Sequence, residues 1–344
     1  MGIFACKKIM YLFILIILII LALSIQKGQL QFVRSFDVKL INVCQLLLAL
    51  SIVMAHLSQY LKASWLKPFT TCGGWAVPIF FFISGYGLYY SLKHKRNYLQ
   101  GFIYKRLGKI LVPFILSSTL YVLLWWINDV NLHDYIFAWR NIKPFILPYS
   151  WFVLSIIVFY LLFYVAYNMT ANHKTAFILT FIGVFAYESY RLALGSNPNT
   201  FCAGICFPLG ILSAQYEDKI TYFFQRQNCQ TVYFFIALFA FASVFLYNSF
   251  GKIYCALTFY LLIRLVPQNV KLLLLAKKYI QKMHFNKISY EIYLTQGIAF
   301  LALRNKYLYL DSSLLYVLAC IATVIIISGG VFQASKFINR IIKI

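Results

Sequence analysis

The chain has 344 residues, of which 62% are hydrophobic, 19% are aromatic and only 11% are charged. Soluble domains carry about a quarter charged residues, so this composition excludes a soluble globular domain. The formal net charge is +23, but the basic residues lie between apolar stretches rather than along one soluble face. This distribution favours the excess of Lys and Arg found on cytoplasmic loops over nucleic-acid binding, and no nucleic acid is expected as a partner.

Apolar stretches recur along the whole chain. A stretch of about 17–25 residues crosses roughly 30 Å of hydrocarbon as a helix, whereas a membrane β-barrel would show alternating segments of about ten residues, which are not evident. The predicted spans cover residues 9–25, 40–60, 74–92, 110–127, 150–168, 175–192, 200–214, 231–248, 251–267, 288–304 and 313–334. The sequence therefore predicts an all-α polytopic transmembrane helical bundle in a lipid bilayer, with ten core helices and an extra N-terminal helix. Residues 1–30 are assigned to an extra N-terminal hydrophobic segment and residues 31–344 to the transmembrane domain.

A basic segment at residues 93–109 sets the predicted orientation. It contains no acidic residue, and its basic residues are Lys93, Lys95, Arg96, Lys105, Arg106 and Lys109. Because cytoplasmic loops are enriched in Lys and Arg, this segment is predicted to be a cytoplasmic loop. If successive spans alternate in direction across the membrane, the basic stretches around 271–287 and 336–343 also lie on the cytoplasmic side, which supports the assignment. The 9–25 segment fits this orientation less well, because alternation would put Lys7 and Lys8 on the outer side of the membrane. It is interpreted as an uncleaved helix.

An ionisable side chain inside a membrane span costs about 2.5–3.5 kcal/mol on insertion scales, so each one needs a structural or functional explanation. His56 ends the second span, in "ALSIVMAHLSQY", and a structural hydrogen bond explains it as well as general-base catalysis does. Glu188 and Arg191 lie three residues apart, which favours a structural ion pair. Glu291 lies four residues into the 288–304 span and should face the protein interior.

The cysteines are the remaining candidates for a metal site. There are eight, and they show no zinc-ligand spacing, so no metal is expected. Cys202 and Cys206 lie one helical turn apart in an apolar span, as small packing residues do.

Five motifs follow His56 in a defined order. They are "GGWAVPIFFFISGYGL" (73–88), "FIYKRLGKILVPF" (102–114), "SWFVLSIIVFYLLFY" (150–164), "FPLGILSAQY" (207–216) and "ISYEIYLTQ" (288–296). In this order and spacing they resemble the acyltransferase-3 family of membrane-bound O-acyltransferases, of the polysaccharide O-acetyltransferase type. The resemblance extends from about residue 36 to residue 336.

The resemblance implies a function. Members of the family have a ten-helix core that moves an acyl group, usually acetyl from cytoplasmic acetyl-CoA, to a hydroxyl of a carbohydrate. The expected protein is thus an O-acetyltransferase of the bacterial inner membrane, with acetyl-CoA as co-substrate and a cell-envelope carbohydrate as acceptor. The family histidine falls on His56, which would act as general base or as a transient acyl carrier.

The resemblance also implies roles for other residues. The family's Arg-x-x-Arg motif falls on Arg106 and Lys109, which with Lys105 would hold the CoA phosphates. The alternative explanation is that these basic residues only set the orientation of the chain in the membrane. Gln45 would orient the thioester or the imidazole by hydrogen bonding. The candidates for contact with the substrate are Ser84, Trp151, Tyr290, Glu291 and Tyr293. Packing explains Ser84 and the tyrosines equally well, and Trp151 could equally be an interfacial anchor.

The chain departs from the family pattern at four positions. Lysine replaces the second arginine of the basic motif at Lys109, which keeps the charge but loses the bidentate fork. Asn42 and Gln45 stand where the family usually has an acidic and a basic residue, and Gln296 stands where it often has histidine.

Two other classes of membrane protein compete with the enzyme. A polytopic transporter or flippase would also have many spans with buried ionisable groups, but the chain shows no inverted repeat and few carboxylates. A polysaccharide polymerase would have a large outer loop, whereas the longest predicted outer loop is 128–149. The acyltransferase is therefore the favoured hypothesis.

Overall fold

A computed structural model describes residues 38–61, 63–128, 147, 150–226, 229–246, 250–265 and 287–342, together with the single residue Ile19. Apart from Ile19, the predicted N-terminal helix at 9–25 lies outside the described residues. So do residues 271–286, which contain most of one predicted basic stretch, and nearly all of the predicted outer loop at 128–149.

The described chain is built from helices, and each of the ten predicted core segments overlaps one of them. They are α2 (Val38–Tyr60), α3 (Cys72–His94), α4 (Phe102–Ile127), α6 (Trp151–Met169), α7 (His173–Ala193), α8 (Pro198–Gln215), α10 (Cys229–Phe245), α11 (Gly251–Arg264), α13 (Ser289–Ala302) and α14 (Ser313–Ile341). Two further elements are the short 3-10 helix η1 (Ser64–Phe69) and α9 (Glu217–Arg226), which the sequence did not predict. The all-α class is confirmed.

Local sequence explains several helix ends. The Asn172 side chain accepts hydrogen bonds from the backbone N–H groups of Lys174 and Thr175, and so caps the start of α7. Ser312 caps α14 in the same way through the N–H of Leu315. α4 begins at Phe102 after Gly101, whose φ of 66° is the left-handed conformation that glycine adopts without strain.

The number of helices that can cross a membrane is smaller than the predicted number of spans. Six helical stretches of the described chain are long and apolar enough, and a seventh arises if α9 and α10, bent by 118°, count as one span. The qualifying stretches are Leu40–Tyr60, Ser64–His94, Phe102–Ile127, Trp151–Met169, His173–Ala193 and Ser313–Ile341. α8, α10, α11 and α13 fall short by length or composition, and α13 is only 14 residues long. The chain is a polytopic membrane protein, but not every predicted span has full membrane-crossing length.

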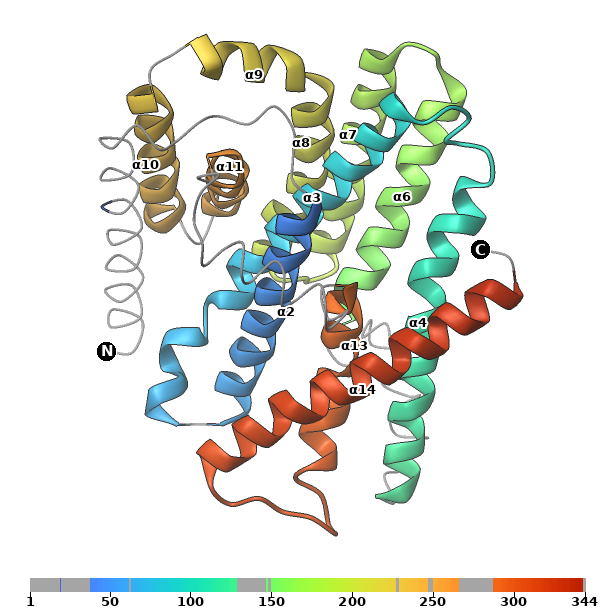
Figure 1. The fold of residues 1–344 in the computed structure, drawn as a ribbon, viewed down its shortest axis with the longest axis vertical. Coiled ribbons are helices and arrows are strands. Elements are labelled where there is room, and N and C mark those ends of the chain that lie inside the picture. Colours follow the sequence, from blue (N-terminus) through green and yellow to red (C-terminus); the bar gives the residue numbers. More distant parts are fainter. Residues whose placement is uncertain are drawn as a thin grey trace.

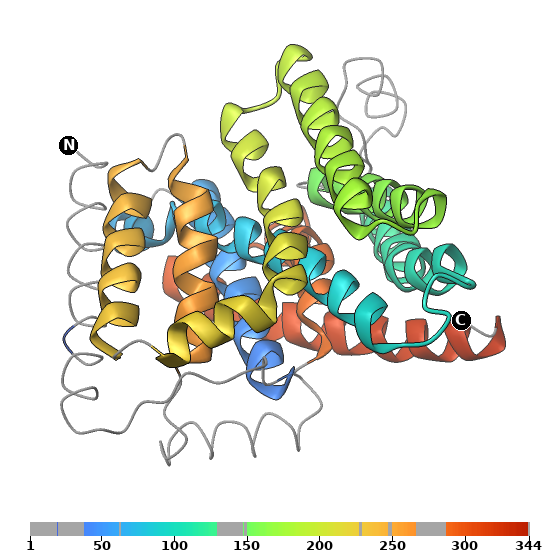
Figure 2. The same cartoon turned by 90° about the horizontal axis from the view of Figure 1, so that it is seen from above.

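α3 and α13 are the central helices of the bundle. α3 runs through the middle of the view in Figure 1 and packs against α2, α8 and α11. α13 is enclosed by α2, α4 and α14, and α14 crosses in front of it in Figure 1. The view from above separates the α10–α11 pair from the α6–α7 pair, which lie on opposite sides of this centre (Figure 2). The inner faces of α2, α3, α4, α6 and α13 therefore converge on a common interior.

The contact between α3 and α8 depends on two glycines. A Cβ added to Gly85 would overlap the carbonyl oxygen of Phe207, and a Cβ added to Gly210 would overlap that of Phe82. Small residues let membrane helices approach to backbone contact. Gly85, which follows Ser84 in the quoted motif, therefore sets how closely α3 packs against α8.

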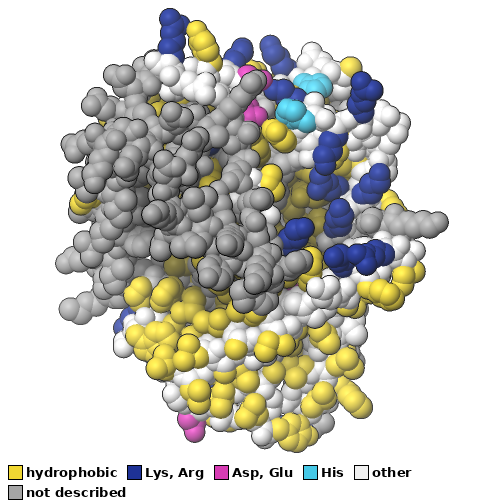
Figure 3. Space-filling model, in the orientation of Figure 1, with side chains coloured by type: hydrophobic (Ala, Val, Ile, Leu, Met, Phe, Trp, Pro, Cys, Tyr) yellow, Lys and Arg dark blue, Asp and Glu magenta, His cyan; other side chains and the backbone are white. Residues whose placement is uncertain are grey.

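Basic side chains gather at one end of the bundle, on the right of the face shown in Figure 3. The exposed ones from α3, α4, α14 and the α3–α4 connection are Lys93, Lys95, Arg96, Lys105, Lys109, Lys336 and Arg340. The Tyr104 hydroxyl donates a hydrogen bond to the carbonyl of Ile342, which joins the start of α4 to the end of α14. The predicted basic stretches at 93–109 and 336–343 thus lie on the same side. One detail of the prediction is wrong, because Lys105, Arg106 and Lys109 lie in the first turns of α4 rather than in a loop.

Candidate active site

A cavity of about 170 Å³ lies where five helices meet. Its lining residues are Gln45 and Ile52 from α2, Val77, Phe80 and Ser84 from α3, Ile110 from α4, Phe152, Ile156 and Tyr160 from α6, and Ser289, Tyr290 and Tyr293 from α13. Most of these side chains are apolar or aromatic, with a few polar groups among them, as is usual for small-molecule sites. The cavity brings together four of the predicted site residues, which are Gln45, Ser84, Tyr290 and Tyr293.

His56 lies on the face of α2 that lines this cavity. Gln45 and Ile52 are seven residues apart and His56 follows Ile52 by four, so all three share one side of the helix. At 1.5 Å per residue, the eleven residues from Gln45 to His56 span about 16 Å along the axis. Gln45 is therefore too distant to hydrogen-bond the imidazole, and that part of its predicted role is wrong. Its other predicted role, orienting the thioester in the cavity, is compatible with its position.

The imidazole of His56 is held from α13. Its Nδ1 lies 2.8 Å from Oε1 of Gln296 in a hydrogen bond. Nε2 of Gln296 donates a second hydrogen bond of 2.9 Å to the backbone carbonyl of Tyr293, which lines the cavity. Gln296 is only 1% exposed. The sequence identified Gln296 only as a departure from the family pattern, because a contact between residues 240 positions apart leaves no local signal.

A hydrogen bond within the protein already engages one of the predicted substrate contacts. The Tyr290 hydroxyl donates to the carbonyl of Ile110 at 3.1 Å. Ser84 and Tyr160, from α3 and α6, both line the cavity. Tyr293 packs edge-on against Phe152, with ring centroids 5.5 Å apart. These contacts join α4, α6 and α13 around the cavity and keep its walls in place.

Arg106 stands between the basic end of the bundle and the cavity. It precedes the lining residue Ile110 by four positions on α4, so the two side chains lie on one face of the helix. Its Nη2 donates to the Tyr98 hydroxyl at 2.6 Å, and the guanidinium carbon lies 5.4 Å from the centre of that ring. Tyr98 lies in the connection between α3 and α4. Burial raises the pKa of its hydroxyl, and the nearby Arg106 offsets part of that rise. The side chains of Lys105 and Lys109 are exposed on neighbouring positions.

Trp151 does not line the cavity. Arg191 lies over its ring, 5.0 Å from the centroid, and the ring also packs near Phe81 at 6.2 Å. Nη1 of Arg191 bonds Oε2 of Glu188 at 3.0 Å and Oγ of Ser155 at 3.2 Å. The predicted structural ion pair between Glu188 and Arg191 is therefore confirmed, and Trp151 braces it.

Glu291 is buried, as predicted, but on a different side of α13 from the cavity. It is 6% exposed, and its Oε2 has no hydrogen-bond partner among the described residues. Thr295, one turn further along the same face, bonds Ser328 of α14 at 2.8 Å. Glu291 therefore lies on the side of α13 that carries Thr295, and the structure does not bring it to the cavity with the other predicted substrate contacts.

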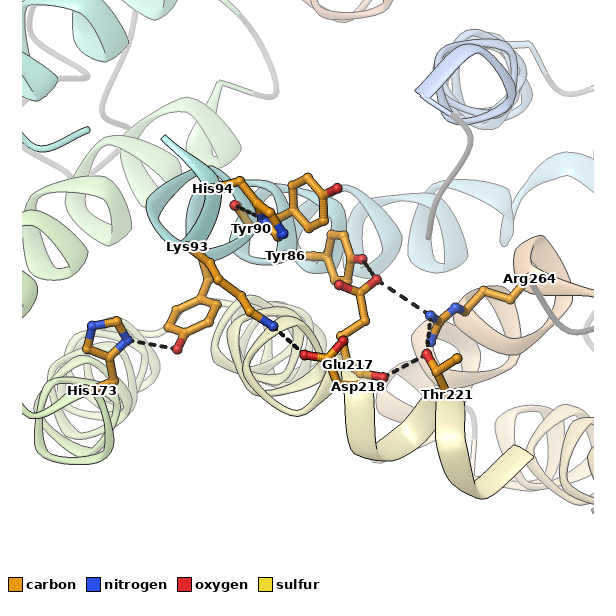
Figure 4. Close-up of polar contacts among 10 residues, drawn as sticks. Tyr86, Tyr90, Lys93, His94, His173, Glu217, Asp218, Thr221 and Arg264 are labelled. Atoms are coloured by element: carbon orange, nitrogen blue, oxygen red, sulfur yellow. Dashed lines mark hydrogen bonds and ion pairs between the residues drawn. The ribbon is translucent and has the colours of Figure 1, made fainter. Parts of the chain in front are cut away.

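A second polar cluster, which the sequence did not predict, ties α9 to the core at the basic end (Figure 4). Glu217 accepts a hydrogen bond from the Tyr86 hydroxyl and pairs with Nη2 of Arg264 at 3.5 Å. Arg264 also donates to Thr221 at 2.9 Å and to Tyr260 at 2.6 Å. All of these residues are buried, which points to a structural role. The local signal was the acidic pair Glu217–Asp218, in a chain with only eight acidic residues.

A metal site does not arise in the described part of the chain, where no three His, Cys, Asp or Glu side chains are grouped to hold an ion. Cys202 and Cys206 are buried on α8, and the Cys206 thiol donates to the Cys202 carbonyl at 3.5 Å. Both cysteines pack within the helix bundle, in agreement with the sequence interpretation.

Comparison with known protein families identifies the family of the chain. A family model described as an acyltransferase domain matches residues 38–329, which is most of the chain and extends from the start of α2 into α14. No curated protein and no solved structure matches the chain. Both the cavity and the His56–Gln296 pair lie within the matched residues. The chain is a membrane acyltransferase and belongs to the acyltransferase-3 family.

Proposed function

We propose that this acyltransferase is an O-acetyltransferase that moves an acetyl group from acetyl-CoA to a hydroxyl of a cell-envelope carbohydrate. The observation that carries the proposal is the continuity of three features. Arg106 lies at the basic end of α4, the cavity begins one turn further at Ile110, and the α2 face that lines it continues to His56. This order gives a place for the CoA phosphates, the acyl group and the base.

The basic end suits the donor. The CoA phosphates would bind Arg106, Lys109 and Lys105, since charge-assisted hydrogen bonds to phosphate are about twice as strong as neutral ones. The start of a helix also favours anions, and these three residues lie in the first turns of α4. In a bacterial inner membrane with this end facing the cytoplasm, acetyl-CoA would reach the site directly.

The cavity suits a short acyl group. A volume of about 170 Å³ is close to that of the ~150 Å³ apolar cavity that accepts benzene. An acetyl group and the adjoining thioester fit such a space, whereas a long acyl chain would need a much longer channel. Gln45 and Ser84 supply polar groups beside a thioester in this cavity.

His56 would supply the proton transfer. The imidazole takes the proton from the acceptor hydroxyl as its oxygen attacks the thioester carbonyl. The carbon–sulfur bond then breaks, and the CoA thiolate leaves with the proton from the imidazolium. A two-step route through an acetyl-imidazole gives the same products, with the thiolate leaving before the hydroxyl attacks. General acid–base catalysis of this kind contributes about 10²–10⁴-fold.

Inverted membrane vesicles test the proposal. Vesicles that contain the protein receive acetyl-CoA labelled in the acetyl group, and both the vesicle glycans and their acetyl esters are analysed. We expect label in alkali-labile esters on glycan, and none in vesicles from cells without the gene. Movement of unmodified solute or glycan across the membrane with no ester formed would instead identify a transporter or flippase.

A further inference from the structure

We propose that Gln296 is a positioning residue for His56, which it holds as the Nδ1–H tautomer so that Nε2 is the basic nitrogen. Its role in acyl transfer rests on the proposed function, whereas the tautomer follows from the hydrogen bonds alone. No sequence motif assigns this role to position 296, where the chain departs from the family pattern.

The backbone carbonyl of Tyr293 sets the orientation of the Gln296 amide. One end of the amide lies 2.9 Å from the backbone carbonyl oxygen of Tyr293. A carbonyl oxygen only accepts hydrogen bonds, so the amide nitrogen must face it. A flipped amide would set two carbonyl oxygens against each other. The amide oxygen therefore faces His56.

The protonation of His56 follows from this orientation. Oε1 of Gln296 lies 2.8 Å from Nδ1 of His56 and can only accept. Nδ1 must therefore carry a proton and donate it to the bond. In a neutral imidazole the other nitrogen is then unprotonated, so Nε2 holds the lone pair.

The same bond persists through a catalytic cycle. When Nε2 takes a proton from the acceptor hydroxyl, the imidazolium still has its proton on Nδ1, and Gln296 still accepts it. The ring therefore changes charge without rotating. A neutral amide orients the ring without adding a charge beside it, which distinguishes Gln296 from a carboxylate partner.

The protein fixes the amide firmly enough for this role. Gln296 is 1% exposed on α13, which is enclosed by α2, α4 and α14. Its anchor, the Tyr293 carbonyl, belongs to a residue that lines the cavity. The turn of α13 that shapes the cavity wall therefore also sets the orientation of the imidazole.

The tautomer can be measured directly. Protein labelled with ¹⁵N-histidine is placed in nanodiscs at a pH where imidazole is neutral, and the His56 signals are assigned as those lost in His56→Gln. We expect a protonated Nδ1 and an unprotonated Nε2 in the wild type, and a shift toward the Nε2–H form in Gln296→Leu. The matched control is Thr295→Val, which removes the adjacent hydrogen bond to Ser328 and should leave the His56 signals unchanged. An Nε2–H signal in the wild type, or an unchanged tautomer in Gln296→Leu, would overturn the proposal.

Kinetics test the consequence for acyl transfer. We expect Gln296→Leu to lower kcat about 10²-fold with KM for acetyl-CoA little changed, because a misplaced catalytic group loses rate rather than donor binding. Gln296→Glu keeps an acceptor for Nδ1 and should recover part of that loss, which also guards against a misfolded leucine variant. Full activity in Gln296→Leu would refute the positioning role. A wild-type protein that transfers no acetyl group would refute the proposed function, while the NMR result would still decide the tautomer.

Discussion

Gly85 on α3 lies directly against the backbone carbonyl of Phe207 on α8, with no space between them for a Cβ. Ser84, the preceding residue, lines the cavity, so this contact sets where one wall of the cavity stands. The motif "FFISGYGL" thus combines a packing residue and a cavity residue in consecutive positions.

The Gly85→Ala variant should be destabilised. The added methyl group meets backbone rather than a flexible side chain, so the cost should reach or exceed the upper end of the usual 1–3 kcal/mol for overpacking. Thermal unfolding of the protein in detergent measures the effect. Gly87→Ala is the matched control, because nothing lies within 4 Å of its added Cβ, and helix propensity there predicts a gain of up to about 1 kcal/mol. Equal melting temperatures for the two variants would contradict the account of the α3–α8 contact.

The buried pair of Glu217 and Arg264 should matter far more to stability than the exposed pair beside it. Glu217→Gln removes the carboxylate that pairs with the buried Arg264, and breaking a buried ion pair typically costs about 3–5 kcal/mol. Lys93 and Asp218 pair at 2.6 Å, but their side chains are 35% and 57% exposed, so Asp218→Asn should cost at most about 1 kcal/mol. Unfolding in denaturant compares the two. A larger loss in Asp218→Asn would show that the cluster in Figure 4 does not hold α9 to the core.

Removal of the charges at Arg106 and Lys109 should weaken donor binding. The double variant Arg106→Ala/Lys109→Ala loses charge-assisted hydrogen bonds worth about 1.5–3 kcal/mol each, so the Kd for acetyl-CoA should rise at least about tenfold. Equilibrium dialysis with protein in nanodiscs gives the Kd. The control is Lys174→Ala/Lys219→Ala, which removes two exposed charges at the starts of α7 and α9. If both double variants bind acetyl-CoA like the wild type, the basic residues of α4 serve orientation alone.

The size of the cavity should set the length of the acyl group. Ile156 lines the cavity, and Ile156→Ala should raise the rate with hexanoyl-CoA relative to acetyl-CoA about tenfold, since one methylene in an apolar pocket is worth roughly 1–3 kcal/mol. The neighbouring variant Ile157→Ala removes the same side chain from a position outside the lining and should leave the ratio unchanged. A change of similar size in both variants would place acyl selection elsewhere.

The helices themselves could be predicted from the sequence, because the width of the bilayer requires long apolar stretches whatever their partners. Their ends were harder to predict. α4 starts at Phe102 rather than at 110, because a helix tolerates Lys105, Arg106 and Lys109 where its first turns leave the hydrocarbon. α9 was missed because its residues are largely polar, and an apolar-run criterion does not detect an amphipathic helix.

The candidate site was predicted only in part. Four predicted residues do meet at one cavity, as the resemblance to the family implied: Gln45, Ser84, Tyr290 and Tyr293. Trp151 and Glu291 do not line it, because the face of a helix on which a residue lies depends on packing against other helices. The contact of His56 with Gln296 joins α2 to α13, and only the folded chain could show that the amide at position 296 lies beside the imidazole.

The most direct test of the central claim compares two histidine variants in the vesicle assay with labelled acetyl-CoA. His56→Ala removes the proposed base, and His94→Ala removes an exposed imidazole at the end of α3, whose Nδ1 bonds the Tyr90 carbonyl of its own helix. The account predicts that His56→Ala lowers transfer of label to glycan by about 10²–10⁴-fold at normal expression, while His94→Ala transfers at the wild-type rate. Transfer by His56→Ala at the wild-type rate would contradict it.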